Sequence, residues 1–195
     1  KLTDEFVDRK VKDSLLLAKN MSNTLNDFRN FFNPDKDKTE FLLKDCLNHS
    51  FELSKYLLEK EKISFTCAIK DNLKINGFYN ELSHVILNII SNSKDALVSK
   101  EKGEDKLIFI VIKKVNDMAQ IIVIDNAGGI PEDVLPKVFE PYYTTKYKSA
   151  GTGIGLYMSK QIVEKHMAGT ISCRNIKHKL GTTELHDCAK FIISI

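Results

Sequence analysis

Residues 121–129, Ile121-Ile-Val-Ile-Asp-Asn-Ala-Gly-Gly129, place a carboxylate and a glycine turn directly after an apolar run. The run predicts a strand of the core, and Asp125 stands at its end. A buried carboxylate is costly unless it is paired, so Asp125 needs a partner there. Gly128 and Gly129 allow the backbone to come close to a bound group because they have no Cβ. The stretch therefore predicts a core strand that delivers a carboxylate to a candidate site.

Upstream of this strand, residues 79–101 predict a helix with a polar face. His84, Asn88 and Asn92 lie four residues apart and therefore share that face, beside an apolar stripe. Asn is a poor helix former whose amide needs partners, so two of them at one-turn spacing indicate oxygen ligands that face a cleft. Mg²⁺ accepts such a carbonyl oxygen together with water and substrate phosphates. The alternative is a helix face that is hydrogen-bonded to neighbouring loops.

Downstream, two further segments suit phosphate groups. Phe139-Glu-Pro-Tyr-Tyr-Thr-Thr-Lys146 offers hydroxyl and ammonium donors, with Phe139 as an anchor in the core. Gly151-Thr-Gly-Ile-Gly-Leu156 opens a helix, and its glycines expose N–H groups where the helix dipole favours anions. The run is neither the dinucleotide Gly-x-Gly-x-x-Gly pattern nor a P-loop. Taken singly, the alternatives are an aromatic packing loop and a glycine hinge that binds nothing.

Around these motifs, helical and strand patterns mix without strict alternation. Helices are predicted at about 41–60, 79–101, 131–138 and 155–166, strands at 63–69, 107–114, 120–125, 169–175 and 189–195, a turn at 116–117, and a loop at 142–150. The pattern predicts an α+β fold, a two-layer sandwich with helices on one face of a mixed sheet.

The N-terminal residues 1–32 carry a separate signal. A seam with one polar member, Ser14, recurs in steps of four and three and predicts a long heptad helix; its members are Val7, Val11, Ser14, Ala18, Met21, Leu25, Phe28 and Phe32. One interpretation is an amphipathic helix that packs on its own domain. The other is half of a helical hairpin that forms a four-helix bundle in a homodimer, with the missing helix just upstream. Residues 33–38 are then a linker to a second domain at 39–195.

Composition excludes several classes of protein. Of the 195 residues 43% are hydrophobic, enough for a core, and the net charge of +3 is too small to indicate nucleic-acid or membrane binding by itself. The four cysteines lie far apart with no Cys-x-x-Cys pair, which indicates reduced thiols in a cytoplasmic protein. The chain shows neither a signal peptide nor an apolar run long enough to span a membrane, and it begins with Lys1, so we expect a fragment of a longer protein.

Four segments resemble, in this order along the chain, four boxes of the sensor histidine kinases. The segments are the asparagine pair 88 and 92, residues 125–129, residues 139–146 and residues 151–156. These are the asparagine box, the first glycine box, the phenylalanine box and the second glycine box. The resemblance covers the chain from end to end. Residues 1–32 are similar to the second helix of the dimerisation and phosphotransfer domain, and 39–195 to the catalytic ATP-binding domain of the GHKL ATPase superfamily.

The resemblance implies roles for individual residues. Asn88 would bind Mg²⁺ with Asn92 beside it at the phosphates, and Asp125 would accept a hydrogen bond from the adenine amino group. Lys146 and His84 are the catalytic candidates. The full set implied for ATP is Asn88, Asn92, Asp95, Asp125, Ala127, Gly129, Ile130, Phe139, Tyr143, Thr144, Thr145, Lys146, Gly151, Thr152, Gly153, Ile154, Gly155, Leu156 and Thr183.

Three positions depart from the commonest family pattern. His84 stands where many relatives in the superfamily have a glutamate base; it is a candidate base, or else a surface or capping histidine. Asp95 stands where many histidine kinases carry lysine and matches a branch with Asn-Ala-x-Asp-Ala. Ala127 replaces the first glycine of Asp-x-Gly-x-Gly, and its methyl group would narrow the pocket.

No histidine precedes His49, so the phosphoacceptor histidine is expected outside this chain. The implied function is transfer of the ATP γ-phosphoryl group to that histidine, for relay to the aspartate of a response-regulator receiver domain. The expected cofactors are ATP and Mg²⁺, without nucleic acid. The expected site of action is the cytoplasm. Any anchoring of the longer protein in the inner membrane would depend on segments outside this chain. Rival functions are another GHKL-type ATPase, a protein-serine kinase, or a pseudokinase that serves as a dimerisation scaffold.

Overall fold

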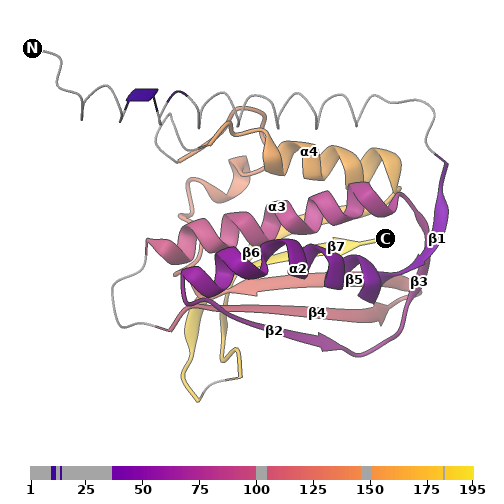
Figure 1. The fold of residues 1–195 in the computed structure, drawn as a ribbon, viewed down its shortest axis with the longest axis horizontal. Helices are drawn as coiled ribbons and strands as arrows, with labels where there is room; N and C mark the ends of the chain where they lie inside the picture. The colour runs from indigo at the N-terminus through magenta and orange to yellow at the C-terminus, as the bar shows by residue number, and fades with distance from the viewer. Residues whose placement is uncertain (1–9, 12–13, 15–36, 100–104, 146–150, 182) are drawn as a thin grey trace, which may run out of the picture.

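The computed structural model describes residues 10–11, 14, 37–99, 105–145, 151–181 and 183–195 (Figure 1). The heptad helix predicted at 1–32 lies almost entirely outside these residues, as do most of the linker and Lys146. They stay predictions. None of the helices in the described part of the chain has the length and apolarity that crossing a bilayer requires.

A five-stranded mixed sheet forms one layer of the fold, in the order β2-β4-β5-β7-β6. The strands are β2 Ser64–Ile69, β4 Leu107–Val115, β5 Met118–Asp125, β6 Thr170–His178 and β7 His186–Ser194. The β2–β4 pair is parallel and the other three pairs are antiparallel. The predicted turn between β4 and β5 is present: Asn116 and Asp117 both have left-handed backbone, with φ of 48° and 63°, which these residue types tolerate in tight hairpins.

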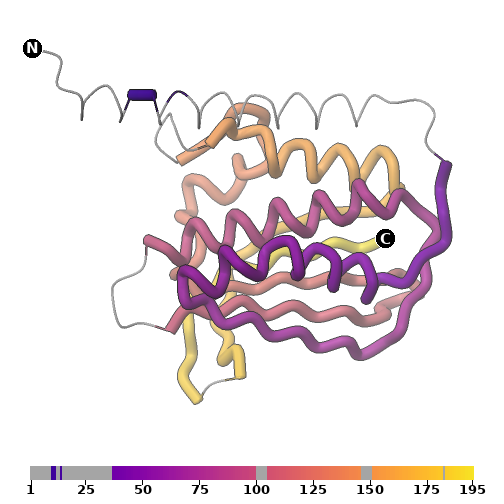
Figure 2. Tube along the Cα trace, in the orientation of Figure 1, coloured from indigo at the N-terminus to yellow at the C-terminus, as the bar shows by residue number. Residues whose placement is uncertain are grey.

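The helices α2 (Leu43–Lys60), α3 (Tyr79–Val98) and α4 (Gly155–Gln161) cover one face of this sheet, as Figures 1 and 2 show. A π-helical turn, Ile162–His166, continues α4. The helix α3 contacts both α2 and α4, and the π-helical turn contacts β6. The α+β prediction, with helices on one face of a mixed sheet, is confirmed.

A second, two-stranded sheet was not predicted. The strand β1 (Thr39–Leu42) pairs antiparallel with β3 (Lys74–Gly77), so the helix predicted from about residue 41 is wrong at its start. The Leu43 N–H donates to the Leu73 carbonyl at 2.9 Å, and the Phe41 ring packs edge-on against Tyr79. Both partners, Leu73 and Tyr79, follow α2 in the sequence, so no local sequence pattern indicates these contacts.

The helix predicted at 131–138 is also wrong. The structure has a turn in which the N–H groups of Val134 and Leu135 both donate to the Pro131 carbonyl, followed by a single 3-10 turn, Leu135–Lys137. Pro136 lies inside this turn and has no N–H, so it cannot donate the bond that an α-helix would need there.

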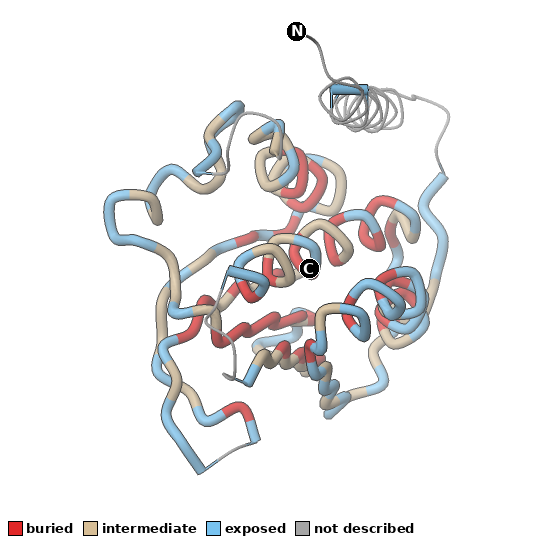
Figure 3. The backbone as a smooth tube through the Cα atoms, turned by 60° about the vertical axis from the view of Figure 1, so that its left-hand side comes forward, coloured by how far each residue is buried: buried red, intermediate tan, exposed pale blue. Residues whose placement is uncertain are grey.

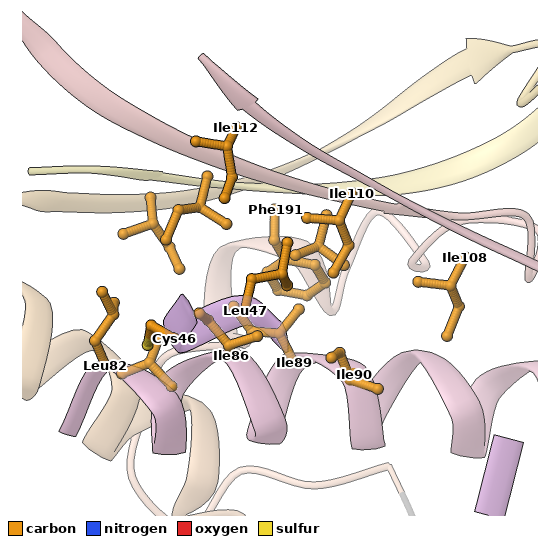
Figure 4. Close-up of a cluster of buried hydrophobic side chains, with 14 of the residues drawn as sticks. Cys46, Leu47, Leu82, Ile86, Ile89, Ile90, Ile108, Ile110, Ile112 and Phe191 are labelled. Atoms are coloured by element: carbon orange, nitrogen blue, oxygen red, sulfur yellow. The ribbon is translucent and has the colours of Figure 1, made fainter. Parts of the chain in front are cut away.

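The core lies between the sheet and the helices. Figure 3 shows the buried residues gathered there, and Figure 4 shows α3 facing the strands. The largest fully buried side chains include Leu47, Leu82, Ile86, Ile89, Ile90, Ile108, Ile110, Ile112 and Ile121. Burying each such side chain contributes roughly 1.5–3 kcal/mol. The apolar stripe of α3 therefore fixes the helix rotation, and with it the direction of the polar stripe that carries Asn88 and Asn92.

Candidate functional site

The polar stripe of α3 meets α4. Asn88 and Asn92 are half-buried, and the Asn88 Nδ2 donates to the Ser159 hydroxyl of α4 at 2.9 Å. The Asn92 Nδ2 lies 3.5 Å from the Asn88 Oδ1, a long contact. The partner of Asn88 is thus a second helix, 71 residues further along the chain.

Two glycines, Gly153 and Gly155, allow neighbouring parts of the chain to approach each other closely. A Cβ added to Gly155, the first residue of α4, would overlap the Asn88 Oδ1, so the amide oxygen lies against the start of this helix. Gly153 has a φ of 68°, and an added Cβ would lie 2.5 Å from the Tyr142 carbonyl carbon. Left-handed backbone and close approach therefore both require glycine at 153. The glycine run joins α3 to the segment that begins at Phe139.

The carboxylate of Asp125 lies at the end of β5 and is only 2% exposed. Its Oδ2 accepts a hydrogen bond from the Ser93 hydroxyl of α3 at 2.7 Å, and its Oδ1 accepts from the Ala127 N–H at 3.2 Å. These bonds offset part of the cost of burying the charge. Asp125, like Asn88, is therefore oriented by a buried serine on a helix.

Next to Asp125, the neighbouring strands β7 and β6 contribute residues to the same part of the sheet, which we call the floor of the candidate site. Asp125, Ala189 and Asn175 occupy one row across β5, β7 and β6. Two residues before Asn175 on β6, on the same face of the sheet, lies Cys173. Burial, and to a smaller extent the charge of Asp125, raises the pKa of its thiol to about 12. This thiol is neutral at physiological pH and contributes no charge to the floor.

Asn175 fixes the glycine turn over this floor. Its Oδ1 accepts from the Ile130 N–H at 2.8 Å, and its Nδ2 donates to the Ile130 carbonyl at 2.7 Å and to the Glu132 carboxylate at 3.3 Å. Gly129 has a φ of 81°, and an added Cβ would lie 2.9 Å from the Asn175 Oδ1. Sequence reasoning missed Asn175. The available signal was a polar residue at an inward-facing position of a predicted strand.

Asn126, the residue after Asp125, was also missed. It is 1% exposed, accepts from the Leu107 N–H at 2.8 Å and donates to the Asp105 carbonyl at 2.9 Å. This side chain continues the β4–β5 pairing beyond the last strand residues and so holds Asp125 in place.

The other predicted residues divide into packing and surface positions. Ala127, Ile130, Phe139 and Leu156 pack against the main core, and Tyr143, Gly151 and Ile154 are half-buried. The exposed positions are His84, Thr144, Thr145 and Thr152. Asp95 pairs with the Lys94 ammonium at 2.8 Å. Thr183 is exposed in the connection between β6 and β7.

Comparison with known proteins identifies relatives. Residues 77–189 match the family of histidine kinase-, DNA gyrase B-, and HSP90-like ATPases, and this range contains all the predicted site residues. The two-component sensor PprA of Pseudomonas aeruginosa is 31% identical over 121 residues, which cover 60% of this chain and 13% of PprA. The sensor histidine kinase ZraS of Escherichia coli K12 is 31% identical over 144 residues, which cover 73% of this chain and 29% of ZraS. The chain thus spans a minor part of these relatives.

Solved structures show the same fold. The catalytic domain of histidine kinase ThkA superposes with a TM-score of 0.69 at 25% identity, over 82% of this chain and 95% of that domain. At lower identity the fold is shared with full-length ShkA in complex with AMPPNP (TM-score 0.72, 19% identity, all of this chain and 39% of ShkA). It is also shared with ThkA in complex with the response regulator TrrA (TM-score 0.68, 20% identity, all of this chain and 53% of that chain).

Proposed function

The chain belongs to the family of histidine kinase-, DNA gyrase B-, and HSP90-like ATPases, and we propose that it is the ATP-binding catalytic part of a sensor histidine kinase. In this proposal it transfers the γ-phosphoryl group of ATP to a histidine outside the chain, and a response-regulator aspartate receives the group next. The names of PprA and ZraS and the fold of the ThkA catalytic domain support it. The complex of ThkA with TrrA supports the class of partner.

The observation that carries the proposal is the distribution of polar groups between two ends of one site. At one end, Asp125 presents a buried carboxylate whose orientation Ser93 fixes. A carboxylate accepts hydrogen bonds only, so it pairs with the amino group of adenine and opposes the carbonyl oxygen that guanine carries instead. Asn175 holds Gly129 over the same floor, where a side chain on that residue would collide.

The other end suits phosphates. The Asn88 amide oxygen lies against the start of α4, where backbone N–H groups and the helix dipole favour anions. An amide oxygen beside a phosphate site fits Mg²⁺, and Asn88, with Asn92 next to it, would hold that ion. When bound, Mg²⁺ neutralises charge on the phosphate oxygens. Lys146 would add an ammonium group from the segment after Thr145.

The protein's own part in the reaction is mostly positioning, because phosphoryl transfer needs little covalent help. Tyr142 packs closely on Gly153, so the segment from Phe139 onward is held to the glycine run and can order with it around the phosphates. His84 is exposed on α3, one turn before Asn88. This location suits a group that meets the incoming second substrate rather than the nucleotide.

Dimerisation through residues 1–32 and an upstream helix completes the proposal, with the phosphoacceptor histidine on that upstream helix. The cytoplasm is the proposed site of action because ATP and response regulators are found there.

The first test is isothermal titration of the chain with AMPPNP, with and without Mg²⁺. The parent chain should bind in the micromolar range, about −8 kcal/mol, and more weakly without metal. Asp125→Asn should weaken this binding strongly, because one of the two acceptor oxygens becomes an NH₂ donor and the negative charge is lost. Asp45→Asn is the matched control, since Asp45 is exposed on α2, and it should bind as the parent does.

Two outcomes would contradict the proposal. Absence of AMPPNP binding by the parent would leave the dimerising scaffold as the better function. Equal binding by Asp125→Asn would remove the adenine contact. If binding holds, a histidine-bearing dimerisation domain is supplied in trans with ATP. Phosphate release without labelling of the histidine would then favour a hydrolase.

A further inference from the structure

Ser159 connects the two helices that meet at the phosphate end. It lies one turn into α4, is 2% exposed, and makes two hydrogen bonds through one hydroxyl group. The Asn88 Nδ2 lies 2.9 Å from its Oγ, and the Gly155 carbonyl lies 3.0 Å from the same atom. No other described residue joins the Asn88 amide to α4 by a hydrogen bond.

The Ser159 hydroxyl has a single hydrogen, and this determines which atom of the Asn88 amide faces the Ser159 Oγ. A serine hydroxyl has one hydrogen, and a carbonyl oxygen can only accept, so the Ser159 hydrogen points to the Gly155 carbonyl. The Oγ is then left as an acceptor. Its partner on Asn88 must therefore be the donor, Nδ2, because two facing acceptors would repel each other.

The opposite end of the amide follows from this. With Nδ2 held at Ser159, the Asn88 Oδ1 faces the start of α4, where the absence of a Cβ on Gly155 leaves room for it. Rotation of the amide by half a turn would place a donor there instead, and an NH₂ group repels a cation. Without Ser159, the two orientations are separated only by the long contact from Asn92 at 3.5 Å.

We propose that Ser159 is a positioning residue for metal-dependent nucleotide binding: it locks the Asn88 amide with its oxygen toward the Mg²⁺ position. This inference rests on the proposed function. It assigns Ser159 no contact with ATP. Its effect is confined to the metal-dependent part of the affinity, and this separates it from a residue that merely stabilises the fold.

The test measures the AMPPNP dissociation constant of the whole chain by isothermal titration, once with saturating Mg²⁺ and once in EDTA. Ser159→Ala should weaken binding with Mg²⁺ about tenfold, the size typical of residues that orient a metal ligand, and leave binding in EDTA unchanged. Ser159→Thr keeps the hydroxyl and should restore the metal dependence. Ser54→Ala is the matched control, because Ser54 is a buried serine that also donates to the carbonyl four residues earlier. It should match the parent under both conditions.

Each outcome separates the two proposals. If Ser159→Ala keeps the full effect of Mg²⁺, or loses affinity equally with Mg²⁺ and in EDTA, the positioning role is wrong while the proposed function stands. If the parent does not bind AMPPNP, or binds it equally with and without Mg²⁺, the metal site of the proposed function is wrong and this inference with it. Thermal melting of each variant reports whether it is folded.

Discussion

Ile130 and Asn175 are 45 residues apart, and the Asn175 amide pairs with both the N–H and the carbonyl group of Ile130. The pair imitates one step of a β-ladder with a side chain in place of a strand. It attaches the turn after β5 to β6, two strands away in the sheet. The position of the turn that contains Gly129 thus depends on Asn175, a residue outside the four sequence motifs.

Replacing Asn175 by Ala should therefore loosen this turn. Both groups of Ile130 would lose their partner, which we expect to lower the free energy of unfolding by about 1–3 kcal/mol. AMPPNP affinity should fall as well, because Gly129 is no longer held in place. Urea unfolding and isothermal titration measure the two effects. Asn76→Ala, at an exposed position of β3, is the control and should change neither.

Gly155→Ala separates stability from binding. Ala is favoured over Gly by up to about 1 kcal/mol in a helix, and the overlap with the Asn88 amide opposes this gain, so the melting temperature should change little. The new Cβ would overlap the Asn88 Oδ1 and force the amide away from the start of α4. AMPPNP binding with Mg²⁺ should then weaken at least as much as in Ser159→Ala. A Gly155→Ala protein with the affinity of the parent would show that this close approach is not used.

Ser93→Ala tests the adenine end. The Asp125 Oδ2 would lose a buried charged hydrogen bond, which is worth about 1.5–3 kcal/mol of unfolding free energy. Because Ser93 orients Asp125, the proposed adenine ligand, and does not contact Asn88, AMPPNP affinity should fall by the same factor with Mg²⁺ and in EDTA. A loss confined to the Mg²⁺ condition would argue against the division of the site into two ends.

Thiol chemistry provides a probe of the floor. The Cys173 pKa of about 12 leaves roughly one molecule in 10⁴ as thiolate at pH 8, and the thiolate is the reactive form. Cys67 is exposed, whereas Cys173 is half-buried, and burial raises the pKa of the Cys67 thiol above its ordinary 9.0 as well. Iodoacetamide at pH 8 should therefore alkylate Cys67 well before Cys173, as peptide mass spectrometry can follow. Urea should bring the four cysteines to similar rates. Preferential labelling of Cys173 in the folded chain would contradict the buried floor.

The thiols of Cys46 and Cys173 predict that the free energy of unfolding falls at alkaline pH. Burial raises the pKa of Cys46 to about 11 and that of Cys173 to about 12, from an ordinary 9.0. Between the unfolded and folded values the native state holds protons that the unfolded state releases, so stability falls as pH rises above about 9. Cys46→Ala with Cys173→Ala should flatten this decline between pH 9 and pH 11, measured by urea unfolding. An unchanged slope in the double variant would assign the decline to other groups.

Much of the fold was accessible from the sequence, for identifiable reasons. The strand that ends in Asp125 has an uninterrupted apolar run, and α3 has an apolar stripe of helical period, so both elements were predicted. The strands β1 and β3 have four residues each and are stabilised by each other, which leaves no periodic signal. Pro136 lies inside the segment 131–138 and argues against a helix there, because it has no N–H to donate.

The candidate site divides in the same way. Asn88, Asp125 and Gly155 were identified because their residue types are unusual for their local structure. Ser93, Ser159 and Asn175 were missed, because a serine in a helix or an asparagine in a strand is unremarkable until its partner is known. Those partners lie 32, 71 and 45 residues away along the chain.

The position of β7 between β5 and β6 determines when β6 can join the sheet during synthesis of the chain. The strand β6 pairs within the five-stranded sheet with β7 alone, and β7 pairs with β5, so β7 is the link that attaches β6 to the rest. A nascent chain that has emerged from the ribosome only as far as residue 185 has α3 and Asp125, but no strand to hold Cys173 and Asn175 beside them. The row that joins Asp125 to Asn175 is therefore completed only after residues 186–194 have been synthesised and have inserted between β5 and β6.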